Sequence, residues 1–371
     1  MSVPRNMQAP WRAALPRFSP RAEYTPSGRL SFNPGRYFLS KLHRGASADI
    51  LTQAVDRQEL SPRSVLPVRP AKMLPGQLDR IRGACFGGIE DVRRDFIGGF
   101  DSIQAATTAY RILDAVLIDG ILYKGNTVGH LRPRSSRLPF RRVPLEFTQA
   151  SLYESWLGNR WFGNWLTDDC LAYRLAETIG SPVTTDRLTG HKADYENRLA
   201  MRALRADCAH FRELILFDDT SHNDGKQERA TDMRRRLIGD DAPRHPGAFL
   251  LRGRSGDERI LQNERQVADH LAVRRGFTVI DPSSVDLDTI ITACAGADVV
   301  AGVEGSHLTH GLMVMPDNAR AFVIQPPTRA VSALKRLTDR QGQDYALVIG
   351  DGHERGFRAD IGEIERTLDL A

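Results

Sequence analysis

The chain has 371 residues, of which 41% are hydrophobic and 26% are charged, so it can form one large or two medium globular domains. This composition excludes a wholly disordered or collagen-like chain, and no apolar run approaches the ~20 residues of a membrane-spanning helix. The net charge of +5 comes from residues 1–45, which carry eight basic side chains and one acid. The rest of the chain therefore gives no indication of nucleic-acid binding.

Residues 1–45 form a basic tail that also contains six prolines and several aromatic side chains. Two interpretations stay open. The tail either binds peripherally to anionic lipid, or it is an arm, that is, a segment that packs around its own domain. Proline at this density opposes an amphipathic helix, which favours the arm. The four cysteines form no CxxC pair, and prolines interrupt any signal-peptide core. We therefore expect a cytoplasmic protein, with a peripheral position at the inner membrane as the alternative.

Residues 46–245 are predicted to form an N-terminal α/β domain. Residues 111–131 contain short apolar runs separated by turns at Asp119-Gly120 and at residues 124–126, which predicts a β-hairpin or meander. A helical pattern covers residues 156–179 and ends at Gly180. Beyond it the patterns predict, in order, a helix, a buried strand and a charged helix over residues 195–208, 213–217 and 222–236.

After Pro246 strands and helices alternate with short connections. The predicted strands cover residues 248–251, 277–280, 297–303 and 321–325. The predicted helices cover residues 263–275, 287–294 and 306–315. This alternation is typical of βαβ units with a parallel sheet. We therefore expect a Rossmann-like domain over residues 246–350, followed by a tail helix within residues 351–371.

The loop that follows the predicted strand 297–303 carries the clearest sign of a ligand site. Gly302 and Gly305 permit a tight turn and a close approach of a ligand to the backbone. A helix start at Ser306, which is a suitable N-cap, would favour a phosphate. Three further donors lie around the same turn: His307, Thr309 and His310. Many α/β turns carry the same Gly-x-x-Gly spacing for packing alone, so the loop by itself leaves both interpretations open.

This segment resembles the C-terminal signature of glycosyltransferase family 61, which often reads Gly-x-His-Gly-Ala-Gly-Leu-Thr-Asn and is followed by Met-Pro. Here the sequence reads GVEGSHLTH from Gly302, with Met-Pro at residues 315–316. Upstream, LLRGRSGDERILQNE (residues 250–264) is similar to the family's Ser-Arg strand end and its Arg-x-x-x-Asn-Glu helix entry. RGFTVIDPSSVDLDTI (residues 275–290) and WFGNWLTDD (residues 161–169) match further family segments in the expected order.

The sequence also departs from the family pattern. Glu304 and Asn164 stand where the family usually has histidine, and Ser306-His307 replaces an Ala-Gly pair. A carboxylate at Glu304 would repel a diphosphate unless an arginine compensates it. The departures are compatible with an active divergent member, an altered donor, or lost activity.

The resemblance implies two Rossmann-like domains that face a cleft, as in the GT-B fold, and a hexosyl- or pentosyltransferase. It implies inverting transfer from a nucleotide diphosphate sugar, such as a UDP-sugar, to a glycan acceptor in polysaccharide or surface-glycan biosynthesis. Arg252, Arg254 and the 304–310 loop, with Gly302, would bind the donor, because guanidinium groups pair with phosphate oxygens. The resemblance places the acceptor on the side of the N-terminal domain, residues 46–245. Asp168 in that domain is the candidate base, with a surface acid as its alternative role.

Metal-assisted chemistry is not favoured by the remaining motifs. Asp286 and Asp288 satisfy an Asp-x-Asp pattern, but their position before a helix favours N-terminal capping. His307 and His310 lack a third ligand at convincing spacing. We therefore expect no cofactor and a metal-independent enzyme. Two alternatives stay open: a silent nucleotide- or glycan-binding scaffold, and a hydrolase or epimerase of nucleotide sugars.

Overall fold

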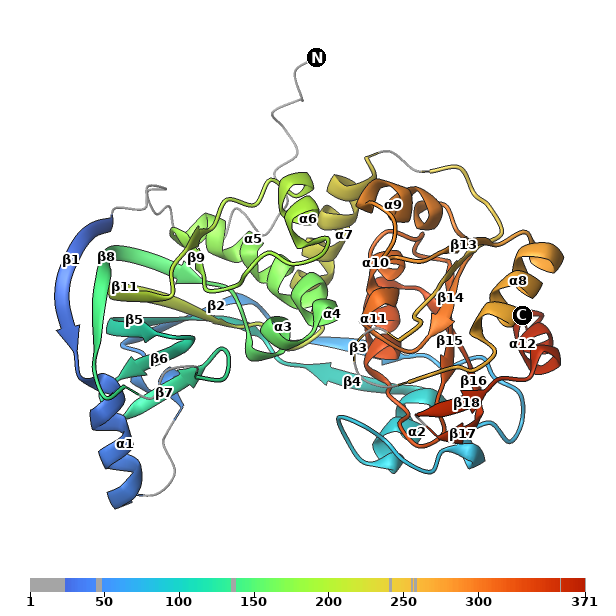
Figure 1. Ribbon diagram of the computed structural model, residues 1–371, viewed down its shortest axis with the longest axis horizontal. Helices are drawn as coiled ribbons and strands as arrows, with labels where there is room; N and C mark the ends of the chain where they lie inside the picture. Colours follow the sequence, from blue (N-terminus) through green and yellow to red (C-terminus); the bar gives the residue numbers. More distant parts are fainter. Residues whose placement is uncertain are drawn as a thin grey trace, which may run out of the picture. The chain divides into compact units, whose positions relative to one another are not determined.

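The computed structural model describes residues 24–44, 49–134, 138–239, 242–254, 256, 259–353 and 355–370 (Figure 1). These residues form two compact units. The first comprises the chain up to Arg63, Ala105–Leu188 and Ala200–Arg229. The second comprises Ser64–Gln104, Thr189–Leu199 and the chain from Ala230 onward. The predicted domains are continuous segments, whereas each unit combines three segments. Most of the predicted basic tail, residues 1–23, lies outside the described residues.

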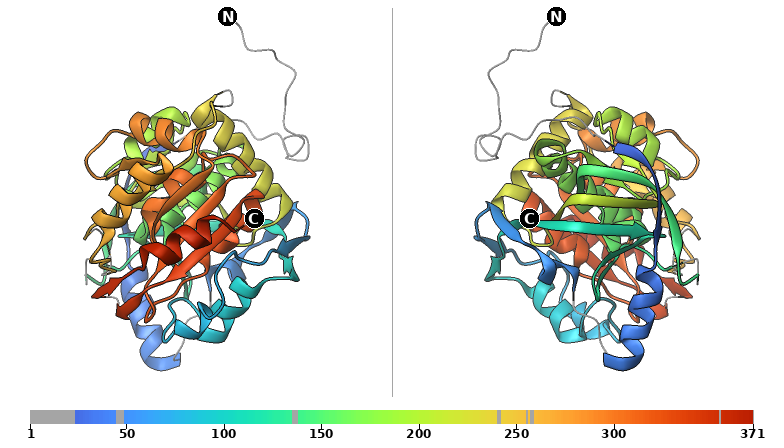
Figure 2. Two further views of the ribbon diagram at one scale, coloured as in Figure 1. Left: turned by 90° about the vertical axis from the view of Figure 1, so that its right-hand side faces the viewer. Right: turned by 90° about the vertical axis from the view of Figure 1, so that its left-hand side faces the viewer.

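The first unit is built on one mixed sheet of nine strands, whose neighbouring green strands are visible in the right-hand view of Figure 2. The main path is β10-β9-β8-β11-β5-β6-β7, with β1 paired to β8 and β2 paired to β5. The strands are β1 (Tyr24–Ser31), β2 (Asp56–Ser61), β5 (Thr107–Ile118), β6 (Ile121–Lys124), β7 (Thr127–His130), β8 (Arg141–Leu152), β9 (Pro182–Thr184), β10 (Leu204–Arg205) and β11 (Cys208–Asp218). The pairs β8–β11, β8–β9 and β9–β10 are parallel, and the other pairs are antiparallel.

The predicted hairpins over residues 111–131 are confirmed as β5, β6 and β7. Asp119 and Gly120 have φ values of 52° and 74°, as a two-residue hairpin turn requires. Such short turns join antiparallel strands only. The sheet of the first unit is therefore mixed, and it differs from the parallel sheet that a second Rossmann-like domain would contain.

The helical pattern over residues 156–179 is divided in the structure. It contains α3 (Trp156–Arg160), α4 (Phe162–Asn164), a π-helical turn (Trp165–Asp169) and α5 (Cys170–Ile179). Trp161 interrupts the helix with an extended backbone, φ −128° and ψ 129°. The helix predicted over residues 195–208 is wrong in its second half, because α6 (Lys192–Arg198) ends early and Leu204–Arg205 pairs with β9. Long-range strand pairing there replaces the local helical preference.

The second unit contains a sheet of five parallel strands in the order β13-β12-β14-β15-β16, coloured orange to red in the left-hand view of Figure 2. Its strands are β12 (Ala248–Leu250), β13 (Thr278–Ile280), β14 (Val299–Val303), β15 (Arg320–Gln325) and β16 (Asp344–Ile349). Its helices include α8 (Glu264–Arg275), α9 (Leu287–Ala295), α10 (Thr309–Leu312), α11 (Ala333–Gln341) and α12 (Ile361–Leu368). The parallel α/β architecture predicted for this part of the chain is confirmed.

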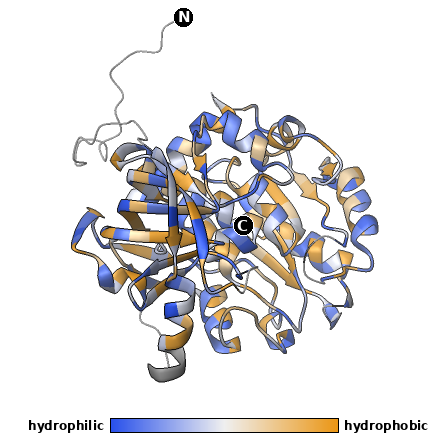
Figure 3. Ribbon diagram, turned by 60° about the vertical axis from the view of Figure 1, so that its left-hand side comes forward, coloured by the Kyte–Doolittle hydropathy of each residue, from blue (hydrophilic) through white to orange (hydrophobic). Residues whose placement is uncertain are grey.

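Smaller elements complete both units. They are α1 (Asn33–Arg44), α2 (Ile89–Ile97), α7 (Asp224–Ile238), and the antiparallel ribbons β3 (Ser64–Val68) with β4 (Phe100–Gln104) and β17 (Asp351–His353) with β18 (Gly356–Arg358). Figure 3 shows mainly hydrophobic strands and helices of mixed character, as expected for elements with one buried face. Within the described residues, no helix is both long and apolar enough to span a bilayer.

Candidate functional site

The loop after β14 lies close to the end of β12 because Gly302 has no side chain. A Cβ added at Gly302 would lie 2.6 Å from the carbonyl oxygen of Leu250 and 2.9 Å from Cδ2 of Leu308. Gly302 also pairs with Leu250 in the parallel ladder. The glycine therefore allows β12, β14 and the following turn to pack closely. This brings the Arg252 segment beside the loop that contains Glu304 and Gly305.

Three basic groups converge on Gly305. A Cβ added at this position would lie 2.8 Å from Nη1 of Arg252, 3.1 Å from Nδ1 of His307 and 3.4 Å from Nη1 of Arg259. Any side chain would therefore occupy the space that these nitrogens surround. Guanidinium and imidazole groups around a backbone that carries no side chain form a suitable environment for phosphate oxygens.

Arg252 is buried and remains a cation at neutral pH. Desolvation, together with the nearby charge of Arg259, lowers the pKa of its guanidinium to about 10. Glu264, at the start of α8, holds the segment by accepting hydrogen bonds of 2.8 Å from the backbone N–H groups of Arg252 and Gly253. Arg254 was predicted beside Arg252 in the donor site, but its side chain is exposed.

Glu304 forms an ion pair with an arginine that the predicted site did not include. Arg259 Nη1 donates to the Glu304 carboxylate, and a second bond of 2.9 Å reaches the Glu304 carbonyl oxygen. Arg329 Nη1 lies 3.9 Å from the same carboxylate, and Glu304 and Arg259 are both buried. Arg259 thus supplies the compensating charge that Glu304 requires. Its position at the start of the Arg-x-x-x-Asn-Glu motif was the signal that could have identified it.

The two histidines of the loop have different surroundings. Burial and the charge of Arg252 lower the pKa of His307 to about 3, so its imidazole is neutral at physiological pH. Its two ring nitrogens are buried and form no hydrogen bond of good geometry within the described residues, although the nearby Leu250 carbonyl favours protonation slightly. His310 is fully buried in a different environment, where its Nδ1 lies 2.9 Å from the hydroxyl of Tyr195. His307 therefore suits ligand binding, whereas His310 has a structural partner.

The helix expected over residues 306–315 is much shorter in the structure. A 3-10 turn (Ser306–Leu308) leads into the four-residue α10, and the N-cap is Gly305 without a side-chain hydrogen bond. The expected N-cap role of Ser306 is wrong, since its carbonyl instead accepts a 2.6 Å hydrogen bond from Thr309 Oγ1. So short a helix contributes little dipole. The positive character of the site therefore comes from the arginines.

Replacing Glu304 with glutamine is expected to destabilise the protein while tightening its binding of inorganic pyrophosphate. The buried arginines lose their counter-charge, which costs about 3–5 kcal/mol. Glu304 is adjacent to Gly305, so removal of its negative charge should tighten pyrophosphate binding at least about tenfold. Thermal unfolding and calorimetric titration measure the two effects. Glu363→Gln, which breaks the Arg80–Glu363 pair, is the matched control. Weaker pyrophosphate binding by E304Q would contradict this assignment of the site.

Asp168, the predicted base, belongs to the first unit and lies in the π-helical turn. Its carboxylate accepts a 2.6 Å hydrogen bond from Nζ of the fully buried Lys226 and a 2.9 Å bond from Nδ2 of Asn164. Lys226 also donates to the Asp219 carbonyl oxygen at 2.7 Å. The side chain of Asp168 is 26% exposed. Asn164, which stands where the family usually has histidine, therefore helps to orient this carboxylate.

Two further acids near Asp168 are buried, and desolvation raises the pKa of both. Asp169 accepts hydrogen bonds from the backbone N–H and the hydroxyl of Ser155, and its pKa lies well above its ordinary value. Glu154 accepts from Thr184 Oγ1 at 2.7 Å and from the Thr185 N–H at 3.0 Å. The sequence patterns did not single out Asp169 or Glu154. The hydrogen bonds of Asp169 anchor the segment that carries Asp168, and those of Glu154 join the end of β8 to the end of β9.

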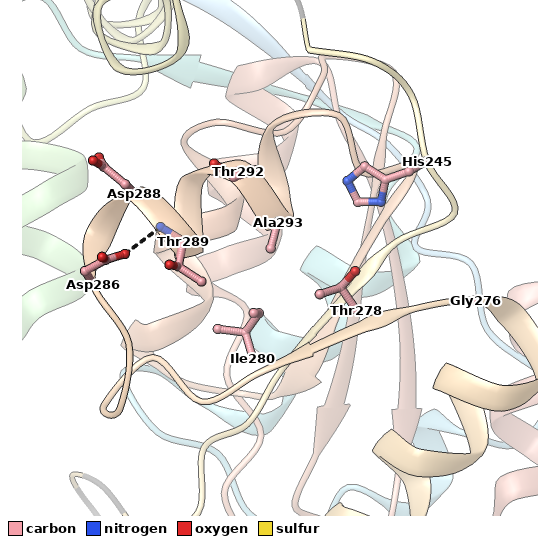
Figure 4. A pocket seen from close by; sticks show the side chains of 9 residues that line it. All are labelled: His245, Gly276, Thr278, Ile280, Asp286, Asp288, Thr289, Thr292 and Ala293. Atoms are coloured by element: carbon pink, nitrogen blue, oxygen red, sulfur yellow. Dashed lines mark hydrogen bonds between the residues drawn. The ribbon is translucent and has the colours of Figure 1, made fainter.

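The Asp-x-Asp pair lies at the start of α9, whereas the arginine cluster, Arg252 and Arg259, lies around Gly305. Asp286 is the N-cap of α9 and accepts a 2.8 Å hydrogen bond from the Thr289 N–H, as predicted. Both aspartates line a pocket of about 550 Å³ on the second unit, which Figure 4 shows with His245, Thr278 and Thr289. Among the described residues there is no group of three or more histidine, cysteine or acidic side chains that could hold a metal ion. The pocket therefore offers no metal ligand set within that part of the chain.

Comparison with known proteins identifies the family. The model of Glycosyltransferase 61 matches residues 108–322, which is more than half of the chain and includes Asp168, Arg252, Arg259 and the Gly302–His310 loop. No curated protein matches the sequence. The match extends over both the predicted base and the arginine cluster. The chain therefore belongs to glycosyltransferase family 61.

Proposed function

We propose that this protein is an inverting glycosyltransferase that moves a hexose or pentose from a nucleotide diphosphate sugar to a glycan acceptor. The process that it serves would be polysaccharide or surface-glycan biosynthesis. Membership of glycosyltransferase family 61 supports the reaction class. The observation that carries the donor assignment is the convergence of Arg252, Arg259 and His307 on Gly305.

In this proposal the arginine cluster stabilises the leaving nucleoside diphosphate. When the bond between the sugar and the diphosphate breaks, negative charge grows on the phosphate oxygens. Arg252 and Arg259 are cations already fixed by burial, so they can stabilise this charge without reorganisation. Neutral His307 can donate one further hydrogen bond from the nitrogen that carries its proton. Gly305 lets the diphosphate approach these groups.

The acceptor hydroxyl needs a base on the face of the sugar opposite the leaving group, and we assign this role to Asp168. Its partial exposure allows contact with an acceptor, while Lys226 and Asn164 fix its position. Trp156 and Trp161 are partly exposed and could stack on sugar rings, whereas Trp165 is buried in the core. The facing two-domain arrangement of the GT-B type stays a prediction. The four free cysteines are compatible with the proposed cytoplasmic location.

A thermal-shift panel of UDP, GDP, CMP and their sugars tests this proposal. A ligand that binds only the native state raises the melting temperature according to its affinity and concentration. We expect one nucleoside diphosphate and its sugars to give a clear shift. We expect the same shift and the same turnover in EDTA as in magnesium or manganese, because the arginines neutralise the diphosphate. A strict requirement for a divalent ion would contradict metal independence, and no shift with any nucleotide would refute the donor assignment.

A second candidate function is that of a catalytically silent relative that binds a nucleotide or glycan as a scaffold. Two observations favour it: the Asp168 carboxylate is held by Lys226 and Asn164, and the anionic Glu304 lies within the arginine cluster. Donor binding without transfer to a broad acceptor panel would support the scaffold. Release of free sugar without an acceptor would instead indicate a hydrolase.

A further inference from the structure

The elements β1, α1 and β8 lie at one side of the first unit (Figure 1), and exposed apolar side chains gather on β1, on α1 and near the start of β8. Between 46% and 60% of each of these side chains is exposed: Leu30, Phe32, Phe38, Leu39, Leu138 and Phe140. Together with the exposed arginines Arg29, Arg36, Arg141 and Arg142 they form what we call the apolar-basic surface. Apolar patches of this kind mark sites of interaction with a protein or a membrane.

The apolar-basic surface is held in place by contacts among its segments. β1 pairs with β8 so that Leu30 faces Arg142 in the ladder. The ring centroids of Phe32 and Phe140 lie 6.0 Å apart, and the Gly35 N–H donates a 2.9 Å hydrogen bond to the Pro139 carbonyl. The exposed groups are therefore presented by an ordered scaffold.

The helix α1 was not expected, because the proline content of residues 1–45 opposes an amphipathic helix. Pro34 is its second residue, and proline is tolerated in the first turn because the N–H groups there have no intrahelical partner. Tyr37 faces inward and packs against Tyr123, with ring centroids 6.1 Å apart. Phe38 and Leu39 are exposed beside it. An amphipathic helix therefore exists in residues 33–44 despite the proline content of the region.

The apolar-basic surface contains a groove with a largely apolar lining. Its volume is about 630 Å³, and its lining includes Leu30, Leu138, Phe140, Pro144 and Leu145. Arg141, Arg142 and Arg205 lie along the same groove. The one acid in its lining, Asp207, is paired with Arg132 at 3.4 Å and with Arg187 at 3.6 Å. The groove therefore offers apolar walls with a basic rim.

Basic side chains predominate in the segments that form the surface. Residues 24–44 and 138–145 contain no aspartate or glutamate. The next acid along β8, Glu146, pairs with Arg212 at 2.6 Å. Arginine beside exposed aromatic and aliphatic side chains suits the interface of an anionic bilayer, where phosphate groups lie above acyl chains.

We infer that the apolar-basic surface binds peripherally to an anionic phospholipid bilayer. Phe38, Leu39 and Phe140 enter the interface, and Arg36, Arg141 and Arg142 contact the lipid phosphates. The groove accommodates part of an acyl chain. This inference does not depend on the proposed glycosyl transfer, since none of these residues belongs to the donor site or contacts Asp168.

Sedimentation of the full chain with vesicles tests the inference. The vesicles consist of phosphatidylcholine alone, or of phosphatidylcholine with about one third of phosphatidylglycerol. We expect binding to the second kind only, and a strong decrease at high salt. The double variant Arg141→Glu and Arg142→Glu should weaken this binding at least about 30-fold. Phe38→Ser with Leu39→Ser should weaken it at least about tenfold, because apolar area no longer enters the interface.

The matched control reverses two other exposed arginines, Arg57→Glu with Arg274→Glu, and should leave vesicle binding within about twofold of the unsubstituted chain. All substituted side chains are exposed, so the melting temperature should change little. Binding that survives both surface variants would assign the contact to residues 1–23 and overturn the inference. Loss of self-association by these variants, with vesicle binding unchanged, would overturn it in favour of a second copy of this chain.

Discussion

Arg252→Ala is expected to weaken the binding of the preferred nucleoside diphosphate by about 10- to 100-fold, which corresponds to a lost charge-assisted hydrogen bond. The guanidinium of Arg252 is the nearest of the three basic groups to the space above Gly305. The backbone bonds from Arg252 and Gly253 to Glu264 remain in the variant. Calorimetric titration and the ligand-induced thermal shift both measure the loss.

Two other arginine variants make this experiment specific. Arg254→Ala removes an exposed guanidinium two residues away, and we expect a much smaller loss of affinity. Arg274→Ala removes an exposed guanidinium near the end of α8 and should have no effect on nucleotide binding. The melting temperature without ligand shows whether each variant is folded. If R252A bound the nucleotide as the unsubstituted protein does, the diphosphate site would have to lie elsewhere.

The architecture of the second unit could be predicted from local patterns because its central elements follow one another along the chain. The strands expected at residues 248–251 and 297–303 correspond to Ala248–Leu250 and Val299–Val303. Gly276 adopts a φ of 70° and ends α8, as its position predicts. By contrast, Ser64–Gln104 joins this unit only through tertiary contacts. No periodicity in that segment indicates which sheet it will accompany.

The first unit shows the opposite situation. Its hairpins β5–β6 and β6–β7 were predicted because the residues of their short turns can be recognised in the sequence. The partners of β8, by contrast, are far from it along the chain. β8 pairs with β11, which is more than fifty positions away along the chain, and with β1, which is more than a hundred positions away. Pairing at such separations depends on the complete fold rather than on local preference. The mixed sheet therefore could not be read from residue patterns alone.

The donor site was partly predictable for a related reason. Gly302, Gly305 and His307 belong to one short segment, and Arg252 follows the strand β12 that pairs beside it. Arg259 and Arg329 reach Glu304 from two other segments of the chain. The carboxylate at Glu304 indicated that a cation was needed, but only the fold shows which arginine supplies it. Glu304, which departs from the family signature, is thus compensated by its ion pair with Arg259.

Asp168→Asn is expected to lower kcat by about 10²- to 10⁴-fold, because the variant cannot accept the proton of the acceptor hydroxyl. Asparagine retains an oxygen that can accept the hydrogen bond from Lys226, so the local geometry should persist. The buried lysine loses its counter-charge, which should cost about 3 kcal/mol of stability. Nucleotide binding should be unchanged, because Asp168 is not among the groups that surround Gly305. Initial rates, nucleotide affinity and thermal unfolding measure these three effects.

Lys226→Met distinguishes a base from a purely structural ion pair. This variant removes the cation but leaves the carboxylate of Asp168, which is partly exposed and can be hydrated. If Asp168 is the base, folded K226M should retain turnover, because the carboxylate that accepts the proton is still present. If the pair only maintains the fold, D168N and K226M should lose activity in proportion to their loss of stability. Full turnover by folded D168N would exclude Asp168 as the base, and the proton would then have to pass to another group.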